Sequence, residues 1–249
     1  MGSEVCRTVV ADPDLELVAA IDPQHAGLDV REVAGIDDVS FPVSGEAQSL
    51  VHAGAEVAVD FTHVDAARQN LEFLAANGIH AVVGTSGFTE AECEALEASF
   101  TSSNCIIAPN FAIGAVLMMR FAELASPHFE SAEIIEMHHH DKPDAPSGTA
   151  LHTAARMAAA RQHGAHDRGQ EIVSGALGAD VEGIPVHSLR THGSQAHQEV
   201  VFGSVGQYLT LRHDTTDYEC FAPGIVLALR SMKSLGPGVS VGLEQLLGV

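Results

Sequence analysis

Residues 137–150 read MHHHDKPDAPSGTA and place three consecutive histidines and a lysine just before a turn and a helix start. Imidazole and amine groups are common proton donors and acceptors in enzymes. Lys142 is one of two lysines in the chain, beside ten arginines. Because an arginine does not give up its proton, the retained amine favours a role for Lys142 as a proton donor.

The adjacent histidines also invite a metal-binding interpretation. Metal ligands must converge on one point, whereas neighbouring strand residues such as His138 and His139 point to opposite faces. We therefore expect no metal site here. Simple exposure to solvent is the other alternative for these histidines.

The second half of the segment is typical of an anion site. Ser147 is a favourable N-cap residue, and the first amide hydrogens of the helix that follows have no partner inside it. Gly148 lets a ligand approach the backbone closely. Together with the nearby imidazoles and ammonium, this helix start suits a small polycarboxylate. A plain N-cap role for Ser147 is compatible with ligand binding.

The elements that must position these residues begin with an alternation of strands and helices. The sequence predicts strands at residues 15–21, 56–61, 79–83 and 104–108, and helices at 3–10, 64–77 and 89–99. This pattern favours a parallel sheet, in which ligands lie beyond the carboxyl ends of the strands. The residues at those ends should line one nucleotide crevice: Asp22, Phe61, Thr62, Gly84, Thr85, Ser86, Ala108, Pro109, Asn110 and Phe111.

The second half of the chain has a different character. It predicts helices at 113–125, 148–162 and 221–232, a long polar segment at 164–183, and strands at 132–138, 184–190, 197–202 and 207–212, with a hairpin turn at 203–206. We therefore expect an α/β chain with a Rossmann-like dinucleotide-binding domain and a second α+β domain with a mixed sheet. The first should comprise residues 1–109 and 222–249, and the second, for substrate binding and oligomerisation, residues 110–221.

The N-terminus departs from the usual dinucleotide-binding pattern, which begins with a strand, G-x-G-x-x-G and a helix, with an acidic residue about 20 positions further on. Here residues 3–10 already have helical character, and Asp22 already follows the next strand. We expect the first strand and most of the glycine loop to be absent, Met1 and Gly2 being its last residues. A start codon assigned too late is the favoured explanation, and a natural truncation is the alternative.

Composition limits the partners. The net charge of −21, from 33 acidic and 12 basic residues, repels nucleic acids and anionic membrane surfaces. The four cysteines are far apart in the sequence, which indicates buried free thiols rather than a zinc knuckle or a disulfide scaffold. No apolar run is long enough to cross a bilayer and no signal peptide is visible, so we expect a cytoplasmic protein.

The stretch from Glu136 to Ala150, EMHHHDKPDAPSGTA, closely resembles the E-x-H-H-x-x-K-x-D-A-P-S-G-T-A motif of the 4-hydroxy-tetrahydrodipicolinate reductase family. Three further segments fit the same family in the same order: VDFT at 59–62, VVGTSG at 82–87 and APNFAIG at 108–114. The resemblance extends over the whole chain.

The resemblance implies a homotetrameric, NADH- or NADPH-dependent enzyme that reduces a small dicarboxylate on the route to diaminopimelate and lysine. It implies that His138 and Lys142 transfer protons, and that His139, Ser147, Gly148 and Thr149 bind the substrate. It also assigns the cofactor to Asp22, Phe61, Gly84, Thr85, Ser86, Ala108, Pro109, Asn110 and Phe111. The alternatives are a non-catalytic or impaired dinucleotide-binding homologue, given the missing glycine loop, and another member of the wider dehydrogenase group.

Three residues depart from the family pattern. Asp141 stands where members often have a second histidine before the lysine, and Tyr218 lies near a position where several members have an arginine. Pro23 rather than a basic residue follows Asp22, which leaves no obvious partner for a 2′-phosphate and favours NADH or dual use.

Overall fold

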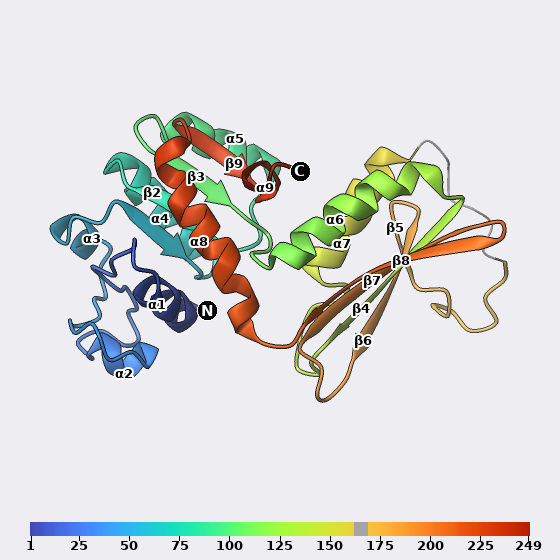
Figure 1. Ribbon diagram of the computed structural model, residues 1–249, viewed down its shortest axis with the longest axis horizontal. Coiled ribbons are helices and arrows are strands. Elements are labelled where there is room, and N and C mark those ends of the chain that lie inside the picture. The colour runs from blue at the N-terminus through green and yellow to red at the C-terminus, as the bar shows by residue number, and fades with distance from the viewer. Residues whose placement is uncertain (162–168) are drawn as a thin grey trace. The chain divides into compact units, whose positions relative to one another are not determined.

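Two separate sheets organise the computed structural model, which describes residues 1–161 and 169–249 (Figure 1). Unit 1 comprises Met1–Ala112 and Phe221–Gly248, and unit 2 comprises Ile113–Cys220 together with Val249. The chain is therefore a mixed α/β protein in which the C-terminal segment returns to the first unit.

Unit 1 contains a parallel sheet with the strand order β1-β2-β3-β9. Parallel neighbours need long crossover connections, and helices supply them here. The helices are α1 (Gly2–Ala11), α2 (Val30–Ala34), α3 (Gln48–His52), α4 (Val64–Ala76), α5 (Glu90–Ser99), α8 (Ala222–Ser231) and α9 (Glu244–Leu247). The strands are β1 (Val57–Asp60), β2 (His80–Val83), β3 (Asn104–Ile107) and β9 (Gly238–Val241).

Both faces of the parallel sheet are covered. Side chains alternate between the faces of a strand, so Ala81 and Val83 share one side, where they are buried with Leu71 and Leu74 of α4. Val82 lies on the other side and is also fully buried. Helix α8 contacts β2 and crosses in front of the sheet in Figure 1. This is the layered arrangement of a Rossmann-like unit.

Unit 2 contains a mixed sheet with the strand order β5-β6-β4-β7-β8, in which β4 and β6 run parallel and the other neighbouring pairs run antiparallel. Its strands are β4 (Ser131–His138), β5 (Ala179–Val181), β6 (Ile184–Arg190), β7 (Ala196–Ser204) and β8 (Gln207–Thr215). Its helices are α6 (Ile113–Ala125) and α7 (Gly148–Ala160), and 3-10 turns occur at Ser126–His128 and Tyr218–Phe221. A further 3-10 turn, Met232–Ser234, lies in unit 1.

Helices α6 and α7 pack on one face of the mixed sheet (Figure 1). Ala154 and Met157 of α7 are fully buried against Ile134, Val200 and Phe202 of the strands. Small alanines on the helix faces allow this close approach, so that β4 and α7 are held together where the segment 138–150 joins them. The core of unit 2 thus positions the residues that carry the sequence motif.

The predicted fold class is confirmed, but some elements differ. Residues 15–21 do not form a strand: only Ile21 makes an isolated bridge, to Ser44, because a strand requires a hydrogen-bonded neighbour along its length. Strands β5 and β9 were not predicted, and β5 falls in the expected polar segment. The hairpin turn narrows to Val205 and Gly206, whose φ of +79° suits glycine. Residue 162, the predicted end of a helix, and residues 164–168 of the polar segment lie outside the described residues.

The described helices are short. The longest, α4, α6 and α7, have 13 residues each, whereas a bilayer span needs about 20. Within residues 1–161 and 169–249, none of the helices has the length and apolar character of a membrane span.

Candidate active site

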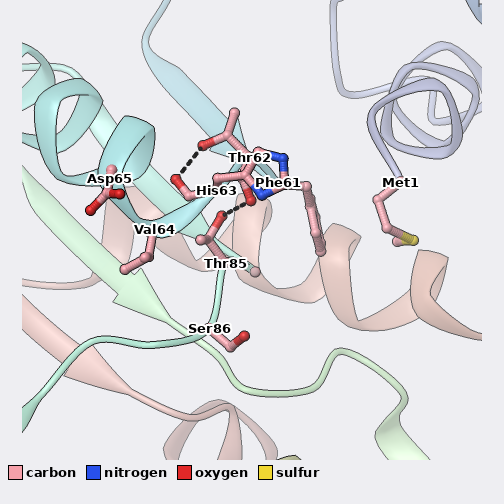
Figure 2. A pocket seen from close by; sticks show the side chains of 9 residues that line it. Met1, Phe61, Thr62, His63, Val64, Asp65, Thr85 and Ser86 are labelled. Atoms are coloured by element: carbon pink, nitrogen blue, oxygen red, sulfur yellow. Dashed lines mark hydrogen bonds between the residues drawn. The ribbon is translucent and has the colours of Figure 1, made fainter. Parts of the chain in front are cut away.

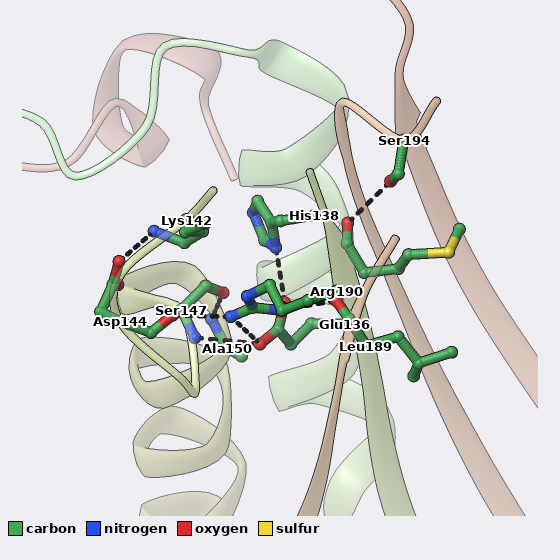
Figure 3. Close-up of polar contacts among 10 residues, drawn as sticks. Glu136, His138, Lys142, Asp144, Ser147, Ala150, Leu189, Arg190 and Ser194 are labelled. Atoms are coloured by element: carbon green, nitrogen blue, oxygen red, sulfur yellow. Dashed lines mark hydrogen bonds and ion pairs between the residues drawn. The ribbon is translucent and has the colours of Figure 1, made fainter. Parts of the chain in front are cut away.

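His138 is the last residue of β4, where it is held by a buried carboxylate (Figure 3). Its Nδ1 lies 2.5 Å from Oε2 of Glu136, two residues earlier on the same face of the strand. The His138 side chain is 16% exposed, and Glu136 is completely buried. In the described part of the chain, the other ring nitrogen of His138, Nε2, has no hydrogen-bond partner. The strand end therefore leaves Nε2 of His138 available for a further contact.

Glu136 is fixed from a neighbouring strand by Arg190. The guanidinium contacts both carboxylate oxygens, Nη1 to Oε2 at 3.0 Å and Nη2 to Oε1 at 2.9 Å. Burial raises the pKa of the Glu136 carboxyl, but hydrogen bonds from His138 and Arg190 outweigh it and lower the pKa to about 2. Glu136 is therefore ionised at neutral pH and only accepts hydrogen bonds.

Lys142 lies in the turn after β4, and its Nζ pairs with Oδ1 of Asp144 at 2.6 Å. The hydrogen bond from Lys142 holds the pKa of the Asp144 carboxyl below its usual range. Asp141, which replaces a histidine of the family pattern, instead lies 2.8 Å from Nε2 of His140 and is largely exposed. The ion pair of Lys142 is therefore with Asp144 and not with its immediate neighbour.

The predicted helix start is present at α7. Ser147 is its N-cap residue, is 3% exposed, and its hydroxyl accepts a hydrogen bond from the amide of Ala150 at 3.2 Å. The space around the Cα of Gly148 is open. Thr149 is in the first turn and half-buried, and His139 is exposed, with its carbonyl accepting a hydrogen bond from the Lys142 amide. The segment 138–150 thus brings an imidazole and an amine close in sequence to an open helix start.

A hollow of about 570 Å³ lies at the carboxyl edge of the parallel sheet in unit 1 (Figure 2). A Cβ on Gly84 would overlap the ring of Phe61, so glycine is required for the close approach of these two strand ends. The lining residues are Met1, Phe61, Thr62, His63, Val64, Asp65, Gly84, Thr85 and Ser86.

Two helix starts border this hollow. Met1 is the N-cap residue of α1, and Val64 and Asp65 open α4; neither helix has a side-chain cap. Free amide hydrogens at helix starts favour phosphate groups. The hollow at the carboxyl ends of parallel strands and the two uncapped helix starts fit a dinucleotide with its pyrophosphate.

Asp60, at the end of β1, organises the loops around this hollow. It is 5% exposed, and its Oδ1 accepts hydrogen bonds from the backbone amide and hydroxyl of Thr62 and from the hydroxyl of Thr85, at 2.8–3.0 Å. Its Oδ2 accepts a hydrogen bond from Nδ2 of Asn70 at 2.7 Å. One carboxylate therefore ties together the chain segments that follow β1 and β2.

The other predicted cofactor residues do not line this hollow. The ring of Phe111 lies 5.5 Å from that of Phe61, and Asn110 caps the amide of Ala112 through its side chain at 2.8 Å. Ala108 is buried and Pro109 exposed in the same loop after β3. Asp22 hydrogen-bonds Nδ1 of His25 at 2.7 Å, which keeps its pKa below the usual range. Of these residues, Phe111 contacts a residue that lines the hollow.

Sequence reasoning missed three residues that hold these groups: Glu136, Arg190 and Asp60. Glu136 and Asp60 stood inside the quoted motifs, and a charged residue in an otherwise apolar strand was the available signal. Arg190 carried no local signal, because it is 54 positions from Glu136.

Within residues 1–161 and 169–249, no group of three or more histidine, cysteine, aspartate or glutamate side chains is placed to hold a metal ion.

A Rossmann-like unit with a hollow at its carboxyl edge, in a chain whose second unit carries acid–base side chains, defines a dinucleotide-binding oxidoreductase. Comparison with known families makes this more specific. The sequence model of the N-terminal part of dihydrodipicolinate reductase matches residues 1–111, and that of its C-terminal part matches residues 114–247. The chain therefore belongs to the dihydrodipicolinate reductase family.

Individual relatives agree over nearly the whole chain. The 4-hydroxy-tetrahydrodipicolinate reductase of Corynebacterium urealyticum is 44% identical, covering 100% of this chain and 95% of that protein. The enzyme of the same name from Nocardia farcinica is 46% identical, covering 99% and 94%. The dipicolinate-bound dihydrodipicolinate reductase from Paenisporosarcina sp. TG-14 is 38% identical, with a TM-score of 0.83, covering 98% and 94%.

Proposed function

We propose that this chain reduces 4-hydroxy-tetrahydrodipicolinate to tetrahydrodipicolinate with loss of water, using NADH or NADPH, in the synthesis of diaminopimelate and lysine. The observation that carries the proposal is the segment 138–150, in which His138 at a strand end and Lys142 in a turn precede the open start of α7. The family membership and the relatives named above support the same reaction.

Residues 1–109 and 222–249 are proposed to bind the cofactor, and 110–221 to bind the substrate and form a homotetramer. Phe61, Gly84, Thr85 and Ser86 line the hollow, and the loop 108–111 completes the cofactor site. Asp22 accepts hydrogen bonds from the adenosine ribose. As in the family, we place the enzyme in the cytoplasm.

The substrate is proposed to bind through its carboxylates. Ser147, Gly148 and Thr149 offer amide and hydroxyl donors at the start of α7, a 13-residue helix whose dipole favours an anion there. The open space at Gly148 admits the ligand. His139, exposed beside this start, supplies a further donor, and Lys142 leaves Asp144 to face the bound anion.

Loss of water needs a proton on the departing hydroxyl and releases a proton from the neighbouring carbon, which forms the conjugated double bond. After hydride has reduced the conjugated system, a further proton must neutralise the resulting enamine. The cofactor supplies the hydride. His138, through Nε2, and Lys142, through Nζ, are the groups proposed to donate these protons.

The test couples purified protein to dihydrodipicolinate synthase and follows the loss of NADH or NADPH absorbance. His138→Ala and Lys142→Ala should each lower turnover at least about a hundredfold, the usual scale for a positioned acid. Two matched controls are available: His140→Ala, which removes the neighbouring imidazole paired with Asp141, and Lys233→Ala, which removes the other lysine, exposed and paired with Glu56. Both controls should stay within about threefold of wild type. Unchanged turnover in His138→Ala and Lys142→Ala would remove the proposed mechanism.

A further inference from the structure

The contacts of Glu136 assign a tautomer to His138. An ionised carboxylate only accepts hydrogen bonds, so the 2.5 Å contact from Nδ1 requires the hydrogen on that nitrogen. The Nε2 atom is then the one that gains and loses a proton, and among the described residues it has no competing partner. This geometry is that of an imidazole oriented by an acid behind it.

Glu136 is itself prevented from turning away. Arg190 contacts both of its oxygens from β6, where Arg190 is the register partner of His138. The amide of Ser147, the N-cap of α7, donates to Oε1 at 3.3 Å. The carboxylate therefore has fixed donors on both oxygens, and rotation would leave a buried charge unpaired.

The same contacts reach the second proton donor. Nη2 of Arg190 donates to the carbonyl of Asp144 at 2.7 Å, and the carboxylate of Asp144 holds Nζ of Lys142 at 2.6 Å. One buried ion pair thus connects the strand end with His138, the turn with Lys142 and the start of α7 (Figure 3).

We propose that Glu136, locked by Arg190, is a positioning residue that keeps the Nδ1-protonated tautomer of His138 and aligns it with Lys142 and the start of α7. The proposal rests on the proposed function for its catalytic meaning, but the tautomer can be measured without any reaction. Other charged or titratable groups at this end of the sheet are His197 with Asp214 on β7 and β8, and His140 with His192 in the loops.

The test is nitrogen-15 NMR of the histidine rings in the full chain. The His138 signals are identified by their loss in His138→Gln. Wild type should show the hydrogen on Nδ1. Glu136→Gln should move His138 toward the Nε2-protonated form, because a glutamine amide has one oxygen and cannot accept hydrogen bonds from both Arg190 and His138.

Glu133→Gln is the matched control, because Glu133 lies on the same strand and pairs with His187 at 2.8 Å; it should leave the His138 signals unchanged. If Glu136→Gln does not fold, Arg190→Lys serves, since it removes the two-point lock and should mix the tautomers.

In the coupled assay, Glu136→Gln should lower kcat about tenfold to a hundredfold while changing the KM for the dicarboxylate less than about threefold. Glu133→Gln should change neither. An Nε2 hydrogen in wild type, or the same tautomer in all variants, overturns the inference even if the enzyme is active. An inactive wild type with the expected tautomers would instead remove the proposed function alone.

Discussion

Two buried carboxylates stand near strand ends in the two units, and they hold different kinds of partner. Glu136 near the end of β4 is completely buried and bonds a guanidinium and an imidazole. Asp60 at the end of β1 is 5% exposed and bonds hydroxyl and amide groups, without an ion-paired base among the described residues. Both carboxylates connect chain segments that follow strands of their sheets.

The difference fits the task proposed for each unit. A group that exchanges protons must be held in one protonation pattern, which a fixed charge achieves. A cofactor cradle needs only its backbone held in place, and neutral donors suffice for that. The comparison predicts that the charge of Glu136 is essential and that of Asp60 is dispensable.

The largest expected effect concerns stability. Glu136→Leu leaves Arg190 without its partner in a buried setting and should cost about 3–5 kcal/mol of unfolding free energy. Asp60→Leu leaves only neutral donors unpaired and should cost about 1–3 kcal/mol. Urea denaturation at neutral pH measures both. The double variant Glu136→Leu/Arg190→Met should recover part of the loss, and equal costs for the two single variants would contradict the comparison.

An effect of intermediate size is expected on the pH dependence of stability. The folded pKa of Glu136, about 2, is below its ordinary 4.5, so its stabilising contribution is complete above 4.5 and is lost as the pH falls toward 2. The stability difference between wild type and Glu136→Gln should therefore shrink by about 1–2 kcal/mol from pH 6 to pH 3. Urea titrations at the two pH values measure it. Lys233→Ala, changed at an exposed position, should track wild type; a difference between wild type and Glu136→Gln that stays constant would argue against the ionised carboxylate.

Elements with local signals were predictable from the sequence. The helix at Ile113–Ala125 and the strand at Ile184–Arg190 have the predicted bounds. Helix α5 begins at the predicted place, where Thr89 and Glu92 cap each other. Strand β9 was not predictable in this way, since its four residues form a strand through pairing with β3, far away in sequence. Residues 15–21 show the converse: β propensity without a pairing neighbour produced no strand.

The same distinction between local signals and long-range contacts applies to the residues of the site. His138, Lys142 and Ser147 lie in one continuous segment, so their types and spacing were visible in the sequence. The contact of Arg190 with Glu136 depends on the register of β6 beside β4, and that of Asp60 with Thr85 depends on the pairing of β1 with β2. The residues with proposed chemical roles were therefore easier to predict than the residues that hold them.

The smallest effect is expected for Asp60→Asn, and it is the sharpest test of the comparison. The amide oxygen of the new side chain can still accept from Thr62 and Thr85. Its NH₂ group would face the Nδ2 of Asn70, but Asn70 can turn its own amide and present an oxygen, because the two ends of an amide have the same shape. Asp60→Asn should therefore weaken NADH binding less than about threefold in calorimetric titration and cost under about 1 kcal/mol of unfolding free energy. Glu136 offers no such exchange, since Arg190 has only donors to present.

The double variant Asp60→Asn/Asn70→Leu, which removes the compensating amide, should bind NADH more weakly than Asp60→Asn. A tenfold or greater loss of NADH affinity in Asp60→Asn alone would show that the cofactor cradle, like the proton-transfer site, depends on a fixed negative charge.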